Sequence, residues 1–368
     1  MSQTRISHDS PSALRLELFP YLDFLSKYGT QWESLLQTAG GAPDLGPQWH
    51  AAVLHSQKIE VRTISVIAAF RDDNLVLVWP FLRKQESWKK LKRIVVVPLH
   101  SVYCLHHSVL TTEPTGQMLE SLLKYLDTIE PNYTWIQFTR LAEGTSIATA
   151  LGNFSHRHTR TESGLTPPYL PINMSWEDFL KSKSANFRSN LKRKSKKLAS
   201  CGKVDHLHFT DKETIITKLN YVRSIEEKSW KAEAGTAITS RDWEWDFYEQ
   251  LVDKVGSGIG MVLTFMTLDD SPIAYDLSLL GHGTAYCMKT SFDSTHADLS
   301  PGYVLRAELM QYMFDLGIRE YDFLGANERY KLEWSQLTRK EFNLSLYNSG
   351  NWLQATLRAF RRCVKNAD

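Results

Sequence analysis

Three side chains in the C-terminal half can take part in proton transfer or charge stabilisation. Asp322 and Glu328 are carboxylates that can accept a proton from an attacking amine if their pKa is raised. Lys331, which follows Tyr330, can stabilise negative charge that grows on a carbonyl or phosphate oxygen. On the residues alone, however, a surface lysine that pairs with Glu328 or Glu333 is the favoured interpretation of Lys331.

A second group of residues has the composition of a helix start. Ser300 offers a capping hydroxyl, Pro301 fixes a near-helical φ, and Gly302 is small. A helix that begins there presents unpaired N–H groups and the positive end of its dipole, which suits a phosphate. An ordinary strand–helix–strand crossover, in which Ser300 only caps the helix, explains the same residues equally well.

The elements that position these residues are predicted to be a strand, a helix, a second strand and a loop. Residues 285–292 suit a half-buried strand. Apolar residues then recur at helical spacing from Leu305 to Met313, and Gly317 ends the run. We expect a second strand at 318–323 and a polar loop at 325–334.

The order of these motifs is similar to that of a known enzyme family. Tyr286 to Asp293, Ser300 to Gly302, Tyr321 to Gly325 and Tyr330 to Trp334 together resemble the acetyltransferase domain of CelD/BcsL-type proteins, which are associated with cellulose biosynthesis. Those proteins belong to the GNAT superfamily and are related to the FemAB aminoacyl transferases. The resemblance covers roughly residues 32–346, and its specific motifs lie in the second half of the chain.

The resemblance implies acyl transfer from acetyl-CoA or another acyl-CoA. In a GNAT fold the thioester lies against the strand that corresponds to 285–291, and the pyrophosphate lies on N–H groups at the following helix start. The cofactor-binding residues that the resemblance implies are Tyr286, Met288, Lys289, Ser300, Pro301, Gly302 and Tyr303. It also matches Lys331 to the lysine of the Phe-Lys motif in FemAB-like enzymes, with Tyr330 in the aromatic position, and Trp230 to a tryptophan of the relatives.

The sequence departs from the family pattern at two places. Ordinary GNAT enzymes carry a Gln/Arg-x-x-Gly-x-Gly/Ala loop, of which Asp298 to Tyr303 keeps only the central glycine. Relatives often show Gly-Asp-Glu where this chain has Ala326, Asn327 and Glu328. Glu328 therefore keeps a counterpart, whereas the acid before it does not.

One pattern of strand, turn, strand and helix occurs twice in the chain. Apolar runs flank Arg71–Asn74 in the first half and Asp269–Pro272 in the second, and Gly116 and Gly302 open the helices that follow. FemAB-like proteins are tandem GNAT folds, so the resemblance implies duplication as well. The alternative is that any two α/β domains look alike at this level. We predict an α/β (α+β) fold with two tandem GNAT-like domains, each a mixed, mostly antiparallel sheet flanked by helices: 1–165, a linker at 166–175, and 176–368.

The two copies differ where the chemistry would take place. Glu113 lies just before the first helix and would repel a phosphate there. No Tyr-Lys loop follows the last strand of that copy. We therefore assign the reactive site to the second copy and a substrate-framing role to the first.

A long basic segment follows the predicted linker. No acid occurs between Lys181 and Asp205, and Arg188, Lys192 and Lys196 fall on one stripe of a helix. Similar charges at that spacing repel one another, so the segment is either a solvated basic face or a surface that binds an anion. The candidate substrate-binding residues are Arg188, Lys192, Arg193 and, by the resemblance, Trp230.

Composition narrows the class of protein. The 368 residues carry a net charge of +2 with a pI near 8.2, so any electrostatic signal is local. No apolar run has the length of a signal peptide or a membrane span, which predicts a cytoplasmic protein. The spacing of the cysteines and histidines predicts reduced thiols and no metal. The amphipathic tail at 351–365 either packs back on the domain or makes a peripheral membrane contact.

Three functional hypotheses follow. The leading one is acyl transfer from an acyl-CoA thioester to an amine or hydroxyl of a small or sugar-like acceptor, such as a precursor of bacterial exopolysaccharide. The second keeps the fold but takes its donor from aminoacyl-tRNA, with the basic segment contacting the RNA backbone. The third is a catalytically silent module that binds an anionic polymer or a partner.

Overall fold

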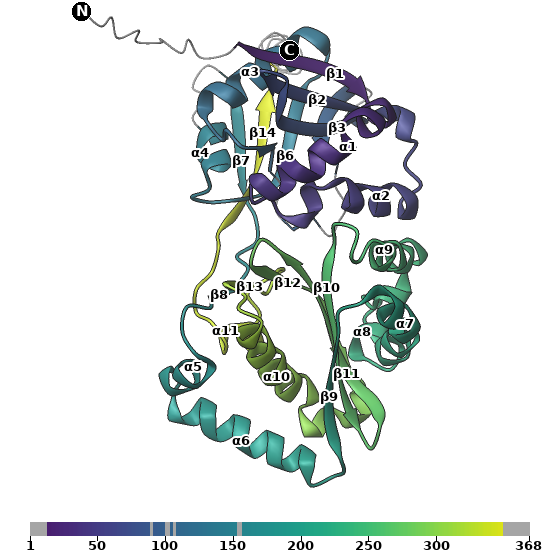
Figure 1. Ribbon diagram of the computed structural model, residues 1–368, viewed down its shortest axis with the longest axis vertical. Coiled ribbons are helices and arrows are strands. Elements are labelled where there is room, and N and C mark those ends of the chain that lie inside the picture. The colour runs from purple at the N-terminus through teal and green to yellow at the C-terminus, as the bar shows by residue number, and fades with distance from the viewer. Residues whose placement is uncertain (1–12, 89–90, 100–103, 106–107, 153–156, 349–368) are drawn as a thin grey trace, which may run out of the picture.

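The chain folds into two sheets that lie one above the other along the long axis of the molecule (Figure 1). The computed structural model describes residues 13–88, 91–99, 104–105, 108–152 and 157–348. The amphipathic tail predicted at 351–365 lies outside these residues. Among the helices that are described, none has the length and hydrophobicity that a bilayer crossing requires.

The first sheet has eight strands and is covered by helices on both faces. Its elements are β1 (Leu14–Pro20), α1 (Tyr21–Thr38), η1 (Pro43–Leu45), α2 (Pro47–Ser56), η2 (Val61–Thr63), β2 (Ile64–Arg71), β3 (Asn74–Trp88), β4 (Leu91–Pro98), β5 (Leu110–Thr111), α3 (Gly116–Ile129), β6 (Trp135–Ala142), α4 (Ser146–Gly152), β7 (Thr159–Ser163) and β14 (Glu341–Tyr347). The strand order is β1-β2-β3-β4-β6-β14-β7, with β5 paired to β3. Phe24 and Trp32 of α1 pack on one face, whereas Leu119 and Leu122 of α3 pack on the other.

The second sheet has six strands in the order β8-β13-β12-β11-β10-β9. Its elements are β8 (Tyr169–Pro171), α5 (Trp176–Ser182), α6 (Ala185–Ala199), β9 (Val204–Phe209), α7 (Lys212–Glu227), α8 (Trp230–Glu233), η3 (Ile238–Ser240), α9 (Asp242–Asp253), β10 (Gly260–Leu268), β11 (Ser271–Gly281), β12 (Thr284–Phe292), η4 (Ser294–Leu299), α10 (Pro301–Asp315), β13 (Glu320–Asp322) and α11 (Arg329–Leu332). Helices α7 and α9 cover one face, and α10 with α5 and α6 covers the other (Figure 1). The predicted fold class is confirmed, because each sheet is mixed, mostly antiparallel and flanked by helices.

The two predicted Asp-Asp turns each close a hairpin. Asp72 and Asp73 join β2 to β3 with φ of 48° and 62°, and Asp269 and Asp270 join β10 to β11 with φ of 48° and 63°. Two successive left-handed residues match the twist of the flanking strands, and aspartate tolerates this conformation better than most side chains. The shared turn is therefore a structural repeat and not only a sequence coincidence.

An apolar core continues from one half of the molecule into the other. Trp49 and Val53 of α2 belong to the same buried cluster as Phe247 and Leu251 of α9. The rings of Trp49 and Phe247 meet edge to face with centroids 5.0 Å apart, and Figure 1 shows α2 next to α9. Full burial of one such side chain stabilises by about 1.5–3 kcal/mol. Hydrophobic burial therefore holds the two halves together.

Two segments cross between the sheets and correct the predicted domain boundaries. β8 lies in the predicted linker at 166–175, yet it pairs with β13 and forms an edge of the second sheet. β14 lies in the predicted domain 176–368, yet it pairs with β6 and β7 in the first sheet. The physical reason is that β14 satisfies backbone groups of β6 and β7 that would otherwise lie on open edges. Apart from these two segments, the boundaries remain a prediction.

A histidine on the edge strand β9 makes folding sensitive to acid. The ring of His208 stacks on Tyr312 of α10 with centroids 3.8 Å apart, and its Nδ1 lies 2.9 Å from Thr264 Oγ1. Burial, together with the nearby charge of His206, lowers the pKa of His208 from 6.5 to about 4. The unfolded chain therefore takes up a proton below pH 6.5 that the folded chain accepts only near pH 4. The contribution of His208 to stability is therefore complete above pH 6.5 and is lost as the pH falls towards about 4.

The variant His208→Phe keeps an aromatic ring on Tyr312 but cannot take up a proton. We expect its free energy of unfolding to fall less than that of the wild type between pH 6.5 and about 4. Urea unfolding at several pH values measures both curves, and groups common to both proteins cancel in the difference. Parallel curves would contradict the assignment to His208.

Candidate functional site

Two neighbouring strands of the second sheet separate after a short parallel contact. β12 and β13 pair only over Thr284–Tyr286 and Glu320–Asp322. β13 ends there, whereas β12 continues to Phe292. Within the described chain, the edge of β12 beyond the contact has no strand beside it, so its backbone groups are open to side chains or a ligand. Lys231 Nζ already donates to Thr290 O on this strand at 2.5 Å.

A β-bulge lies at the same point of β12. The register against β11 shifts by one residue between Leu277 and Ser278, which leaves Met288 as the extra residue. The alternation of side chains is thereby broken. Met288 belongs to the core under α7 and α9, and the next side chain, Lys289, reaches Glu244 on α9 with Nζ to Oε1 at 2.8 Å.

A cavity of about 290 Å³ opens where the two strands separate. This volume suits the reacting part of a small molecule. Four of the predicted site residues, Met288, Lys289, Tyr330 and Lys331, line it together. The rest of the lining consists of Arg140, Leu165, Lys231, Cys287, Thr290, Phe323, Leu324 and Gly325. We call it the splay cavity.

Lys331 braces the loop that forms one wall of the splay cavity. Its Nζ donates to the carbonyl oxygens of Leu324 at 2.7 Å and Ala326 at 3.1 Å, and it lies 2.6 Å from Glu328 Oε2. The pairing with Glu328 is the one that the residues alone favoured, but the lysine is buried and not on the surface. A Cβ at Gly325 would lie 3.2 Å from Nζ, so glycine leaves room for the ammonium group. The catalytic role of Lys331 remains a prediction.

Asp322 lies outside the lining of the splay cavity. It is fully buried, accepts a hydrogen bond from Leu324 N at 2.8 Å, and pairs with Arg339 Nη1 at 2.5 Å. Both interactions fix the end of β13 and its exit loop. Glu328 is about half exposed at its side chain and is the predicted carboxylate with access to solvent.

Arg140 brings the first half of the molecule to the splay cavity. It interrupts β6 with a left-handed φ of 56°, where the register of β6 against β14 shifts. Its Nε and Nη2 donate to Glu341 of β14 at 3.0 and 3.1 Å, and its Nη1 donates to Cys104 O. A left-handed conformation is unfavourable for arginine and persists only where surrounding contacts impose it. This side chain is therefore held in place by the same crossing strand that joins the sheets.

The helix start predicted at Ser300 is present, but its cap is not. Ser300 has φ of 55° and ψ of 48°, and its side chain makes no capping hydrogen bond. A capping residue needs extended backbone for its hydroxyl to reach back to the helix N–H groups, which a left-handed residue prevents. Gly302 faces the ring of Phe292, where a Cβ would lie 3.2 Å from Cδ1. The serine hydroxyl therefore does not occupy the N–H groups at the start of α10, but the backbone oxygen of Ser300 accepts from Tyr303 N at 3.1 Å. Since proline has no N–H, Gly302 N is the open donor among the first three residues of the helix.

The basic helix α6 runs beside this helix start (Figure 1). Lys194 Nζ lies 3.9 Å from the ring centroid of Tyr303, and Lys197 Nζ donates to the backbone oxygen of Asp298 at 2.8 Å. Phe187 packs against Tyr303 from the buried side of α6. Positive side chains thus adjoin the positive end of the α10 dipole.

The other predicted binding residues lie away from the splay cavity. Arg188 Nη1 donates to the backbone oxygen of Lys181 at 3.1 Å and so closes the end of α5. Lys192 and Arg193 are exposed on α6, and Trp230 is 54% exposed. Tyr286 is buried in the core of α7 and α9. None of these five side chains lines the cavity.

Sequence reasoning missed two residues that the cavity brings in. Lys231 follows directly after Trp230, but the resemblance drew attention to the tryptophan. The only sequence signal for Lys231 was its position next to Trp230. Arg140 carries no local signal, because its place depends on β14, which is 201 residues away along the chain.

A buried polar network ties α10 to the sheet under the splay cavity. Arg306 of α10 pairs with Asp276 of β11, with Nη2 to Oδ2 at 3.0 Å, and donates to the hydroxyl of Tyr321 on β13. Asp276 also accepts from Ser278 Oγ at 2.7 Å and from Cys287 Sγ at 3.4 Å. All five residues are buried. One ion pair therefore connects α10 to three strands.

Removing one member of this ion pair should be more harmful than removing both. Arg306→Met leaves the Asp276 carboxylate buried without its cation, and we expect a loss of about 3–5 kcal/mol in unfolding free energy. The double variant Asp276→Leu/Arg306→Met should lose less than the sum of the two single variants. Urea unfolding of all four proteins gives the coupling energy, and additive losses would contradict the network.

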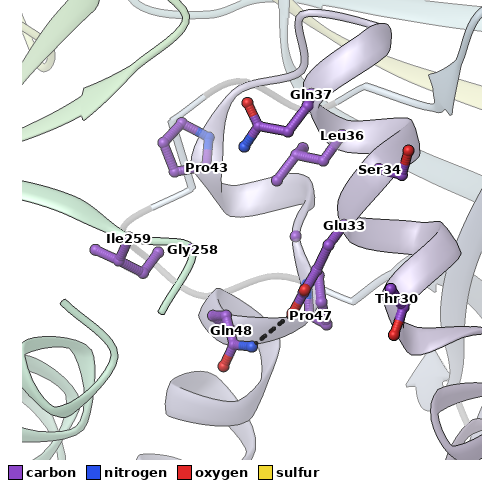
Figure 2. A pocket seen from close by; sticks show the side chains of 11 residues that line it. Thr30, Glu33, Ser34, Leu36, Gln37, Pro43, Pro47, Gln48, Gly258 and Ile259 are labelled. Carbon is purple, nitrogen blue, oxygen red and sulfur yellow. Dashed lines mark hydrogen bonds between the residues drawn. The ribbon is translucent and has the colours of Figure 1, made fainter. Parts of the chain in front are cut away.

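A second cavity of about 350 Å³ lies between the two halves (Figure 2). It is formed by α1, η1, the start of α2 and the turn before β10. Among the described residues that line it, Glu33 is the single charged one, and Glu33 Oε1 accepts a hydrogen bond from Gln48 Nε2 at 2.8 Å. The predicted site residues are all absent from this described lining, whereas four of them line the splay cavity.

Comparison with known protein families gives a match in the C-terminal half of the chain, which contains most of the splay cavity. Residues 185–332 match the model of the acetyltransferase (GNAT) domain family. The match begins with the first residue of α6 and ends with the last residue of α11, so it contains β12, the start of α10 and Lys331. It supports a transferase of the acyltransferase type. A search of functionally curated proteins found no similar sequence.

Solved structures share the fold over nearly the whole chain. FemX matches with a TM-score of 0.51 and 12% identity, over 89% of this chain and 98% of that chain. L-PGS from Bacillus licheniformis matches with a TM-score of 0.52 and 10% identity, over 92% and 96%. A conserved protein of unknown function from Bacteroides thetaiotaomicron matches with a TM-score of 0.53 and 8% identity, over 90% and 100%. At these identities the likeness concerns the fold alone.

Proposed function

We propose that the protein transfers an acyl group, such as acetyl, from an acyl-CoA thioester to an amine or hydroxyl of a small or sugar-like acceptor. The observation that carries this proposal is the separation of β12 from β13 next to the start of α10. The open edge of β12 offers backbone groups to a thioester, and the nearby helix start offers the N–H group of Gly302 and the positive end of the helix dipole to a diphosphate. The match of residues 185–332 to the GNAT acetyltransferase domain supports the same assignment.

The residues present suit the phosphates of coenzyme A. The hydroxyl of Ser300 leaves the N–H group of Gly302 open, and the absence of a side chain at Gly302 keeps the approach to this donor free. Lys194 and Lys197 of α6 add positive charge beside them. A diphosphate would thus meet a backbone donor, a helix dipole and cations in one place.

The chemical step is attack of the acceptor nitrogen or oxygen on the thioester carbonyl. A bond from that atom to the carbonyl carbon forms, the carbon–sulfur bond breaks, and coenzyme A leaves as the thiolate, which then takes up the proton that the acceptor has lost. Open N–H groups of β12 stabilise the oxyanion, and Lys331 adds positive charge from the facing wall. Glu328, 2.6 Å from Lys331 and half exposed, accepts the proton of the acceptor, since Asp322 is held by Arg339.

Acetyl-CoA binding tests the donor directly. Isothermal titration calorimetry should show saturable binding by the wild type. Ser300→Glu places a negative charge at the helix start, so we expect binding to weaken by about tenfold or more. The matched neutral variant Ser300→Gln has the same size and should bind like the wild type. A folded wild type that does not bind acetyl-CoA would refute the acyl-CoA donor.

A second candidate takes its acyl group from aminoacyl-tRNA. The observation in its favour is the exposed face of α6, where Lys192, Arg193 and Lys196 point to solvent without an acid in the helix. Such a face suits a nucleic-acid backbone. The fold likeness to FemX fits this candidate as well as the first one.

Salt-dependent binding of tRNA separates the two donors. Fluorescence anisotropy with labelled tRNA should show affinity that falls steeply between about 50 and 200 mM salt if α6 contacts phosphates. Replacement of Lys192, Arg193 and Lys196 by alanine should flatten that dependence, and the slope should change by roughly 0.9 for each phosphate that is no longer neutralised. Alanine at Lys27, Lys124 and Lys203, three exposed lysines elsewhere, is the control. No binding at low salt would remove this candidate.

From the resemblance in the sequence, we further propose that the protein is a CelD/BcsL-type acyltransferase that acts in the bacterial cytoplasm. The acceptor would then be a precursor of exopolysaccharide. A screen of amino sugars with the acetyl-CoA-bound protein addresses this part of the proposal.

A further inference from the structure

All the charged residues in the described lining of the splay cavity are cations. Arg140, Lys231, Lys289 and Lys331 come from β6, α8, β12 and α11, so four separate elements contribute one positive charge each. Among the residues that the structure describes, no carboxylate is part of this lining. Convergence of like charges from distant parts of the chain is costly unless opposite charges offset it.

Each cation has a carboxylate partner, but that partner lies outside the lining. Glu341 holds Arg140, Glu244 holds Lys289 at 2.8 Å, and Glu328 holds Lys331 at 2.6 Å. The described wall of the cavity therefore carries four cationic residues and no carboxylate. Because Coulomb energy falls with distance, a wall of this composition favours an anion in the cavity.

Lys231 is the least compensated of the four. Its Nζ lies 3.8 Å from Glu226 Oε1, beyond hydrogen-bond distance. That carboxylate is already engaged, because Tyr275 OH donates to Oε1 at 2.7 Å and Ile238 N donates to Oε2 at 2.9 Å.

The ammonium group of Lys231 has three N–H donors. Among the described residues, Thr290 accepts one of them through its backbone oxygen. Burial lowers the pKa of Lys231, which shows that its surroundings stabilise the ammonium group less than water does. An anion beside Lys231 would stabilise its ammonium group and raise its pKa again.

We infer that the splay cavity binds an anionic group, a carboxylate or a phosphate, of the acceptor substrate, with Lys231 as its main contact and Lys289 and Arg140 as neighbours. The assignment of the anion to the acceptor rests on the proposed function, whereas the binding of an anion in the cavity does not. The thioester end of the donor is uncharged, and the donor's own phosphates are assigned to the start of α10. The charge of the cavity is therefore left for the second substrate, and the acceptor would enter with its anionic group held and its nucleophile towards β12.

Calorimetric titration with small anions tests the cavity without any acyl transfer. The probes are inorganic phosphate and acetate, with acetamide as the uncharged counterpart of acetate. We expect saturable binding of at least one anion and none of acetamide. Stronger phosphate binding identifies a phosphate-bearing acceptor, and stronger acetate binding a carboxylate. Failure of both anions to bind the folded wild type would overturn the inference.

The variants locate the anion. Lys231→Gln keeps a donor for Thr290 O but removes the charge, and we expect about tenfold weaker anion binding. Lys203→Gln removes one charge from an exposed lysine that pairs with Asp205, and it should bind like the wild type. Ser300→Glu should also keep the anion. Unchanged binding in Lys231→Gln, or binding lost only in Ser300→Glu, would overturn the inference.

A second variant guards against a folding defect. Glu244→Leu/Lys289→Met removes a cation from the lining together with its buried partner, so neither member of this buried pair is left without the other. It should also weaken anion binding, with a thermal unfolding midpoint near that of the wild type. Acetyl-CoA titration of the same preparation reports the donor separately. Anion binding without acetyl-CoA binding would refute the proposed donor and leave the cavity's ligand class standing.

Discussion

The buried ion pair between Asp276 and Arg306 fixes the relation between α10 and the second sheet. Arg306 also contacts Tyr321 on β13, and Asp276 contacts Cys287 on β12, so a single pair of charges holds the helix against both strands that separate at the splay cavity. A charge taken out of water must be matched closely by its partner, which leaves little freedom for α10 to shift. The position of the helix start relative to the open edge of β12 depends on this constraint.

The splay cavity is a product of both halves of the molecule. Lys231, Lys289 and Lys331 belong to the second sheet and its helices, whereas Arg140 belongs to the first. Arg140 is held by Glu341 on the strand that returns to the first sheet, and the strain of its left-handed backbone is maintained by those contacts. The first half therefore contributes the cation Arg140 to the cavity wall. The apolar contact of α2 with α9 holds the two halves together and so helps to keep Arg140 in place.

Charge is distributed in two places with different surroundings. The exposed cations of α6 lie in solvent beside the start of α10, where salt screens their attraction for an anion. The cations of the splay cavity are mostly buried and each has a carboxylate behind it, where screening is weak and the exact neighbour decides the interaction. Two substrates with separate anionic groups suit this arrangement better than one.

The sequence by itself determined the local elements. The Asp-Asp turns, the helix start at Pro301 and the basic helix follow from residue types and spacing, because turn geometry, proline and periodic charge act over a few residues. The family resemblance in the sequence also pointed to Met288, Lys289, Tyr330 and Lys331, which the fold brings into one cavity. Only the tertiary structure decided the left-handed Ser300, the return of β14 to the first sheet, and the meeting of Arg140 with Lys231. These depend on strand pairing, a bulge and buried charge pairs between residues far apart in the chain, and no local pattern records such contacts.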